Sequence, residues 1–218
     1  MYVFKKDQAK NLTDEELISK IKDGESLFYR DIVKRYNQRL YRIAISYGVY
    51  DDDCDEVIQN TFIKVYEKLD QFRSEARFST WLIRILINEC LMLKRKKKKW
   101  LGLNDIVTLP AGDHLNPEIK YMDEERKKIF EDAVNRLPEK YKSVYILKEI
   151  EGMSIEEITE ILAISKVNVK VRLHRARIIL REFISIDTEV SELFTFGNER
   201  CDRVTSNVMD YILKRKIQ

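Results

Sequence analysis

Hydrophobic residues in the first hundred positions recur every three or four residues, the period of amphipathic helices. Thr13 and Glu16 have the spacing of a capping box, which predicts a short helix that begins there and stops at Gly24. From Ser26 the same period continues with charged residues between the apolar ones. A long amphipathic helix is therefore expected to end near Gly48.

Two further helices are predicted before residue 100. The first follows an acidic stretch in which Asp52 or Asp53 is expected to cap the helix. Its expected buried stripe is Val57, Phe62, Val65 and Leu69. A polar loop, RSEAR, leads into the second helix, which contains RILINECLMLKRKKKKW and ends in six consecutive basic residues, Lys94 to Lys99. Four helices in about a hundred residues are enough for a compact bundle.

Residues 100–120 have a different character. Glycines and prolines interrupt every apolar period, at Gly102, Pro110, Gly112 and Pro117. This composition is typical of an extended linker. Helical periodicity resumes near Tyr121.

The second half of the chain contains a helix-turn-helix pattern. After a break at Pro138, a helix is expected to run to Gly152, and Ser154 with Glu157 forms another capping box. The residues AIS then turn the chain, and Ser165 is expected to cap the helix that follows. Two helices of about 8 and 15 residues joined by such a short turn match a helix-turn-helix unit.

The last of these helices is basic. Its side chains expected to face inward are Val167, Val171 and either Leu173 or Ile178, and lysines and arginines occupy the remaining faces. Such a helix suits the major groove, where its first turns approach base edges while the flanking cations hold phosphates. Spacing alone leaves open a plain helical hairpin with a solvated basic face.

Charge and composition narrow the function classes. The 218 residues carry 40 Lys+Arg against 37 Asp+Glu, so a surface that binds a polyanion must come from segregated charge. Cys54, Cys90 and Cys201 are far apart and fit reduced thiols rather than a metal site. The sequence has no Gly-rich phosphate loop and no nucleophile–base pair, so neither an enzyme nor a cofactor is expected. Without a signal-peptide core or an 18-residue apolar span, a cytoplasmic protein is expected.

Two segments resemble a known family. DCDEVIQNTFIKVYEKLDQFRSEARFSTWLIRILIN is similar to the second region of bacterial RNA polymerase sigma factors of the extracytoplasmic-function (ECF) class. RLPEKYKSVYILKEIEGMSIEEITEILAISKVNVKVRLHRAR is similar to their fourth region, and the two occur in the family's order. The resemblance implies an all-α fold of two small helical domains joined by an extended linker. The expected ranges are 10–99 for the region 2 bundle, 100–120 for the linker, 121–183 for the region 4 helix-turn-helix, and 184–218 for an extension of unknown role.

The resemblance also implies a function. Such a factor binds core RNA polymerase and directs initiation by recognising −35 and −10 promoter elements and opening the DNA, and an anti-sigma factor is an expected further partner. The alternative is a stand-alone helix-turn-helix regulator that is not a polymerase subunit. The exposed polar residues that match the family's polymerase contacts are Asp53, Asp55, Glu56 and Gln59. From the residues alone, these carboxylates could simply cap and solubilise a helix.

The family's −10 contacts map onto the helix with the lysine run. The matching residues are Arg84, Asn88 and Arg95, which share one helix face with Leu91. In the family, an asparagine at the position of Asn88 helps to hold a flipped base, and an amide presents the paired donor and acceptor that a base edge needs. A core amide is the alternative for Asn88. The run KRKKKK is interpreted as a phosphate-binding helix end, with a solvated terminus as the alternative.

The family's −35 contacts map onto the basic helix of the helix-turn-helix. The residues implied are Lys166, Lys170, Val171, Arg172, His174 and Arg175. Arg175 is the candidate for bidentate guanine recognition, while Lys170 and Arg172 suit phosphates. The sequence departs from common family usage at Val171, at Asn168, and at Ala163, where the turn usually has glycine.

The C-terminal extension contains one more apolar pattern. Phe194, Phe196, Val204, Val208 and Ile212 predict a small helix that packs on another surface. Two interpretations stay open, intramolecular packing and a regulatory contact.

Overall fold

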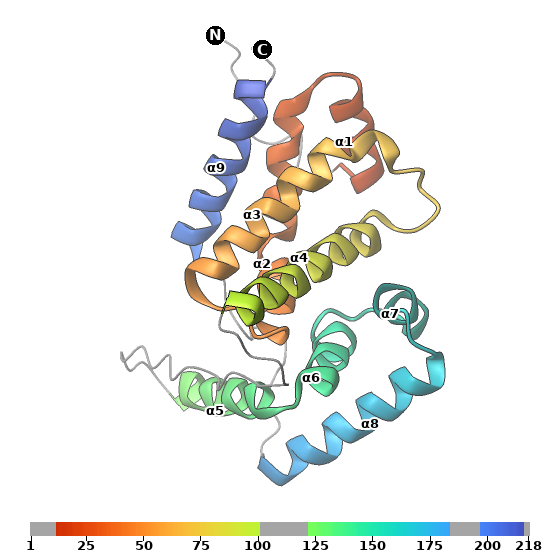
Figure 1. Ribbon diagram of the computed structural model, residues 1–218, viewed down its shortest axis with the longest axis vertical. Coiled ribbons are helices and arrows are strands. Elements are labelled where there is room, and N and C mark those ends of the chain that lie inside the picture. The colour runs from red at the N-terminus through yellow and green to blue at the C-terminus, as the bar shows by residue number, and fades with distance from the viewer. Residues whose placement is uncertain (1–11, 101–121, 184–196, 216–218) are drawn as a thin grey trace.

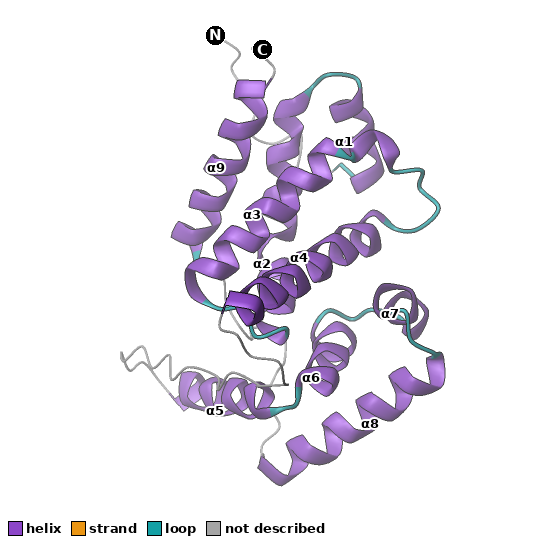
Figure 2. Ribbon diagram, in the orientation of Figure 1, coloured by secondary structure: helices purple, strands orange, loops and turns teal. Residues whose placement is uncertain are grey.

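The computed structural model describes residues 12–100, 122–183 and 197–215, and all regular structure within these ranges is helical (Figures 1 and 2). The first group of helices comprises α1 (Asp14–Lys22), α2 (Tyr29–Ser46), α3 (Asp51–Glu67) and α4 (Phe78–Trp100). The predicted four-helix bundle is therefore present. In the described ranges, no helix combines the length and the hydropathy that a membrane crossing requires.

Local signals set the ends of these helices. At α1 the backbone N–H of Glu16 donates to Thr13 Oγ1 at 3.2 Å, and the Glu16 carboxylate accepts from the Thr13 N–H at 2.7 Å, which confirms the capping box. The expected cap of α3 is wrong. The helix begins directly after Tyr50, so Asp52 and Asp53 lie inside its first turn, where their charges favour the positive end of the helix dipole.

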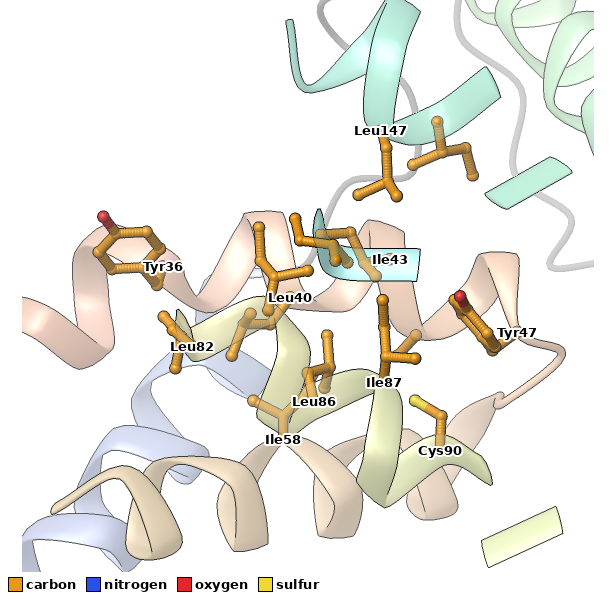
Figure 3. Close-up of a cluster of buried hydrophobic side chains, with 14 of the residues drawn as sticks. Tyr36, Leu40, Ile43, Tyr47, Ile58, Leu82, Leu86, Ile87, Cys90 and Leu147 are labelled. Carbon is orange, nitrogen blue, oxygen red and sulfur yellow. The ribbon is translucent and has the colours of Figure 1, made fainter. Parts of the chain in front are cut away.

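The core of the bundle lies between α2, α3 and α4. Figure 3 shows Leu40 of α2, Ile58 of α3, and Leu82 and Leu86 of α4 pointing toward one another, and all four are fully buried. The predicted stripe of α3 is confirmed, since Val57, Phe62, Val65 and Leu69 are buried. Beneath α3, the Tyr29 hydroxyl donates to the carbonyl oxygen of Phe62 at 2.6 Å, so this buried polar group is satisfied.

The second group of helices contains the predicted helix-turn-helix. Its members are α5 (Met122–Arg136), α6 (Glu139–Tyr145), a π-helical turn (Ile146–Ile150), α7 (Ile155–Leu162) and α8 (Lys166–Phe183). The Ser154–Glu157 capping box that opens α7 is present, with hydrogen bonds of 2.8 and 3.1 Å. Ser165 caps α8 by accepting from the Asn168 N–H at 3.2 Å. Pro138 stands immediately before α6, at the predicted break between two helices.

The expected inward face of α8 is largely wrong. Val167, Val171 and Ile178 are 70, 50 and 40 % exposed, and of the residues expected inside only Leu173 is buried. The helix packs through a stripe of Val169, Leu173, Ala176 and Leu180. These positions are spaced 4, 3 and 4 apart and keep the helical period, but the stripe is rotated from the one expected.

The C-terminal extension contributes α9 (Asn198–Arg215), which lies against α2 and α3 of the first bundle (Figure 1). Val204, Val208 and Ile212 are buried there, which confirms intramolecular packing. The expected linker was wrong by one residue at its start, since Trp100 is the last residue of α4; the rest of it, together with Phe194 and Phe196, lies outside the described residues.

The two helical groups also touch. Figure 3 shows Leu147 of the π-helical turn pointing toward Ile43 of α2, and both side chains are fully buried. Beside them, Glu151 forms ion pairs with Arg39 at 3.0 Å and Arg42 at 2.5 Å. The Glu151 side chain is only 4 % exposed, so these two arginines compensate a nearly buried carboxylate.

Candidate functional site

The four residues expected to bind polymerase all lie near the N-terminal end of α3, but they differ in exposure. Glu56 is exposed, while Asp53 and Gln59 are half-buried. Asp55 is 9 % exposed, so the expectation that it is an exposed residue is wrong. The physical reason is α9, whose Arg200 and Arg203 form ion pairs with the Asp55 carboxylate.

The contacts of Asp55 are dense. Arg200 Nε donates to Asp55 Oδ1 at 3.0 Å, and Arg200 Nη2 donates to the Asp51 carbonyl oxygen at 2.7 Å. Arg203 donates to the other carboxylate oxygen, Oδ2. Gln59, one turn along α3, accepts from Asn207 Nδ2 at 3.1 Å. Two of the four candidate residues are thus bonded to α9.

The candidate −10 residues lie on the exposed side of α4. Asn88 is exposed, which removes the alternative of a core amide. Arg84 and Arg95 are exposed as well, so the three side chains form one polar face. Arg84 is engaged by α7, where its Nη2 donates to the Glu160 carbonyl oxygen at 3.0 Å. An aromatic cluster supports the start of this helix, with the ring of Trp81 5.2 Å from Phe72 and 6.0 Å from Phe78.

The basic run at the end of α4 is divided between protein contacts and solvent. Lys94 pairs with Glu139 of α6, and Lys97 pairs with Asp53 of α3. Arg95, Lys96, Lys98 and Lys99 are exposed. The exposed cations remain able to hold phosphates, whereas the two paired lysines fasten α4 to its neighbours.

A buried lysine lies close to this junction. Lys142 of α6 is 5 % exposed, and burial lowers its pKa to about 8. Of the two charges that act on it, Glu139 raises the pKa and Lys94 lowers it. Lys142 is therefore held in place by the fold and is not available to DNA.

The candidate −35 residues lie on the outer side of α8. Lys166, Lys170, Val171, His174 and Arg175 are exposed, and Arg172 is half-buried. Lys166 pairs with Glu156 of α7 at 2.8 Å, which leaves Lys170 and Arg175 as the exposed cations in the middle of the face. The turn before α8 places Ala163 at a φ of 51°, in the left-handed region. Glycine would adopt this conformation without strain.

Two features of the site were not predicted from the sequence. One is the pairing of Glu151 with Arg39 and Arg42, which joins segments more than a hundred residues apart. The other is the cover that α9 places on Asp55 and Gln59. The apolar spacing of Val204, Val208 and Ile212 was a signal for a packed helix, but it did not identify the partner.

Comparisons with known proteins agree with this geometry. The Sigma-70 region 2 family model matches residues 32–100, which end at the last residue of α4. The Sigma-70, region 4 model matches residues 127–180, which include α7 and most of α8. The chain is 32 % identical to the ECF RNA polymerase sigma-E factor of Haemophilus influenzae over 178 residues, which cover 78 % of this chain and 94 % of that protein. It is also 32 % identical to the ECF RNA polymerase sigma factor SigW of Bacillus subtilis, over 76 % of this chain and 93 % of the relative.

Solved structures show the same fold. The sigma factor RpoE in complex with the anti-sigma factor NepR from Bartonella quintana superposes with a TM-score of 0.57 at 25 % identity, covering 77 % of this chain and 99 % of that one. CnrH in complex with the cytosolic domain of CnrY gives a TM-score of 0.55 at 24 % identity, covering 78 % of this chain and 95 % of that one. Two family models in order and a relative matched over nearly its whole length place this chain in the ECF RNA polymerase sigma factor family.

Proposed function

We propose that this sigma factor binds core RNA polymerase through the N-terminal half of α3, opens −10 DNA with α4 and reads the −35 element with α8. As a member of its family, the chain directs transcription initiation. The observation that carries the −35 assignment is the outward face of α8. Lys170, His174 and Arg175 are exposed there, on a helix positioned by the helix-turn-helix.

The α4 face supports the second part of the proposal. Asn88 is exposed, with Arg84 on one side and Arg95 on the other, so a strand whose phosphates meet the arginines would pass the amide. Flipping a base out of the stack costs a few kcal/mol, and hydrogen bonds to the base edge can supply this energy. DNA opening of this kind is driven by binding, and the chain needs no covalent chemistry for it.

The partners follow from the same assignment. Core polymerase and promoter DNA are the primary partners, and the protein acts where they are found, in the cytoplasm. An anti-sigma factor is a further proposed partner, because the relative RpoE from Bartonella quintana is solved in complex with one. A stand-alone regulator, the alternative reading of the helix-turn-helix, would not require the region 2 bundle that residues 32–100 form.

A charge reversal on α3 tests the polymerase assignment. Glu56 is the candidate that is exposed, so Glu56→Lys changes the surface without breaking a core contact. We expect the dissociation constant for core polymerase to rise at least tenfold, since unlike charges at an interface become like charges. Glu75→Lys, the same charge change in the loop before α4, is the matched control and should bind as the wild type does. If the two variants bind core polymerase equally well, α3 is not part of the interface.

A further inference from the structure

Helix α9 lies along α3 (Figure 1), on the side that carries Asp55 and Gln59, two of the four polymerase-binding candidates. Its apolar stripe is closed off from solvent, with Val204, Val208, Met209 and Ile212 between 0 and 3 % exposed. Side chains on its other face, such as Leu213, are exposed. The helix is therefore docked by a defined amphipathic face.

Polar contacts follow the same line from one end of α3 to the other. Asp55 binds Arg200 and Arg203, and Gln59 binds Asn207. At the C-terminal end of α3, Glu67 accepts from the Tyr211 hydroxyl at 2.6 Å and pairs with Arg215. Acidic and amide groups of α3 thus meet basic and amide groups of α9 in register.

A buried amide fixes the position of α9 on α2 as well. Asn37 is 1 % exposed, and its Nδ2 donates to the Cys201 carbonyl oxygen at 3.2 Å and lies 3.3 Å from Thr205 Oγ1. The guanidinium of Arg200 lies 5.3 Å from the centre of the Tyr41 ring, a cation–π contact. A helix that slid by one residue would lose these contacts, so the docking is specific.

We propose that α9 is an autoinhibitory helix that covers part of the polymerase-binding face of α3, at Asp55 and Gln59, and must be displaced before core polymerase can bind. This inference rests on the function proposed above for α3. Asp55 and Gln59 cannot bond to polymerase while they are bonded to α9. Because Arg200 and Arg203 of α9 cover the Asp55 carboxylate, this group becomes available to polymerase only when α9 leaves. The apparent affinity for polymerase is then the intrinsic affinity multiplied by the fraction of molecules in which α9 is undocked.

Loosening α9 in the full-length chain tests the proposal. Val208→Asp places a carboxylate in the docked apolar stripe, while Leu213→Asp makes the same change on the exposed face of the same helix. Binding of each labelled protein to core RNA polymerase is measured by fluorescence anisotropy. We expect Val208→Asp to bind at least tenfold more tightly than the wild type, and Leu213→Asp to stay within about twofold of it.

A second variant allows the same test if Val208→Asp does not fold. Arg200→Glu combined with Arg203→Glu turns the contact with Asp55 into repulsion without altering the apolar core. It should also tighten binding at least tenfold, with helical circular dichroism retained. If the wild type binds core polymerase and a folded loosened variant binds equally or less tightly, α9 is a structural part of the bundle and the proposal is overturned. If no form binds core polymerase, the assignment of α3 itself fails, and the role of α9 falls with it.

Discussion

Arg84 of α4 donates from Nη2 to the backbone carbonyl oxygen of Glu160 on α7, at 3.0 Å, and lies 3.2 Å from the Glu160 carboxylate. In our assignment the same guanidinium contacts a DNA phosphate near the −10 element, and it cannot serve both partners at once. Both side chains are 45 % exposed. Exposed pairs of this kind contribute about 0.2–1 kcal/mol, so promoter DNA can displace Glu160 at small cost.

The role of Asn88 leads to the first prediction. Asn88→Ala should reduce promoter opening about tenfold, since it removes hydrogen bonds to a flipped base worth roughly 1–3 kcal/mol. Opening is measured by the fluorescence of 2-aminopurine placed in the −10 element. Affinity for core polymerase and the melting temperature should hardly change, because Asn88 is exposed. An equal loss of opening and core binding would make Asn88 a structural residue.

Arg175 and Lys170 should differ in their effect on promoter choice. Arg175→Ala should change the preference at a single −35 position by about 1–3 kcal/mol, as expected for a bidentate guanine contact. Lys170→Ala is the matched comparison and should weaken binding by a similar factor on every sequence, because a phosphate contact carries no base information. Binding to a library of −35 variants measures both. A uniform loss for Arg175→Ala would reassign that side chain to a phosphate.

Local chemistry explains why much of the fold was predictable. The starts of α1 and α7 depend on capping boxes, in which both partners lie within four residues of one another. The inward face of α8 was not predictable, because two interleaved apolar stripes exist on that helix. Packing against its neighbours selects the stripe with Val169 and Leu173 over the one with Val167 and Val171.

The exposure of the proposed polymerase-binding residues on α3 was also only partly predictable. Asp55 reads as a surface carboxylate in its own helix, and its burial comes from Arg200 and Arg203, about 145 positions later in the chain. No local sequence pattern indicates a contact between residues so far apart in the chain. The candidates Asn88 and Arg175 were located by the resemblance to the family, whereas the apolar pattern alone left a core position open for Asn88.

The turn of the helix-turn-helix gives a stability prediction. Ala163 adopts a φ of 51°, a left-handed conformation that costs a residue with a Cβ roughly 1–2 kcal/mol. Ala163→Gly should therefore raise the free energy of unfolding by about 1 kcal/mol and the melting temperature by a few degrees. Ala163→Val, which is β-branched, should lower both. If the melting temperature of the glycine variant is lower than that of the wild type, the backbone at Ala163 is not strained.

Lys142 predicts a dependence of stability on pH. Burial holds its pKa at about 8 in the folded chain, against an ordinary value of 10.5. The unfolded chain therefore binds more protons between these values, and the contribution of Lys142 to stability rises with pH from about 8 to 10.5. Below pH 8 the buried charge costs about 3 kcal/mol. Lys142→Met should be more stable than the wild type at pH 7, and this advantage should shrink as pH rises. A constant difference between the two urea denaturation series would contradict the assignment.

Transcription from purified components shows whether the chain directs initiation at specific promoters. The full-length chain is added to core RNA polymerase with fragmented genomic DNA from the organism that encodes it, and the 5′ ends of the transcripts are mapped. We expect discrete start sites, each preceded by shared −35 and −10 sequences at a fixed spacing. If the transcript ends are the same as those made by core polymerase alone, both with α9 intact and with α9 loosened by Val208→Asp, the chain does not direct initiation.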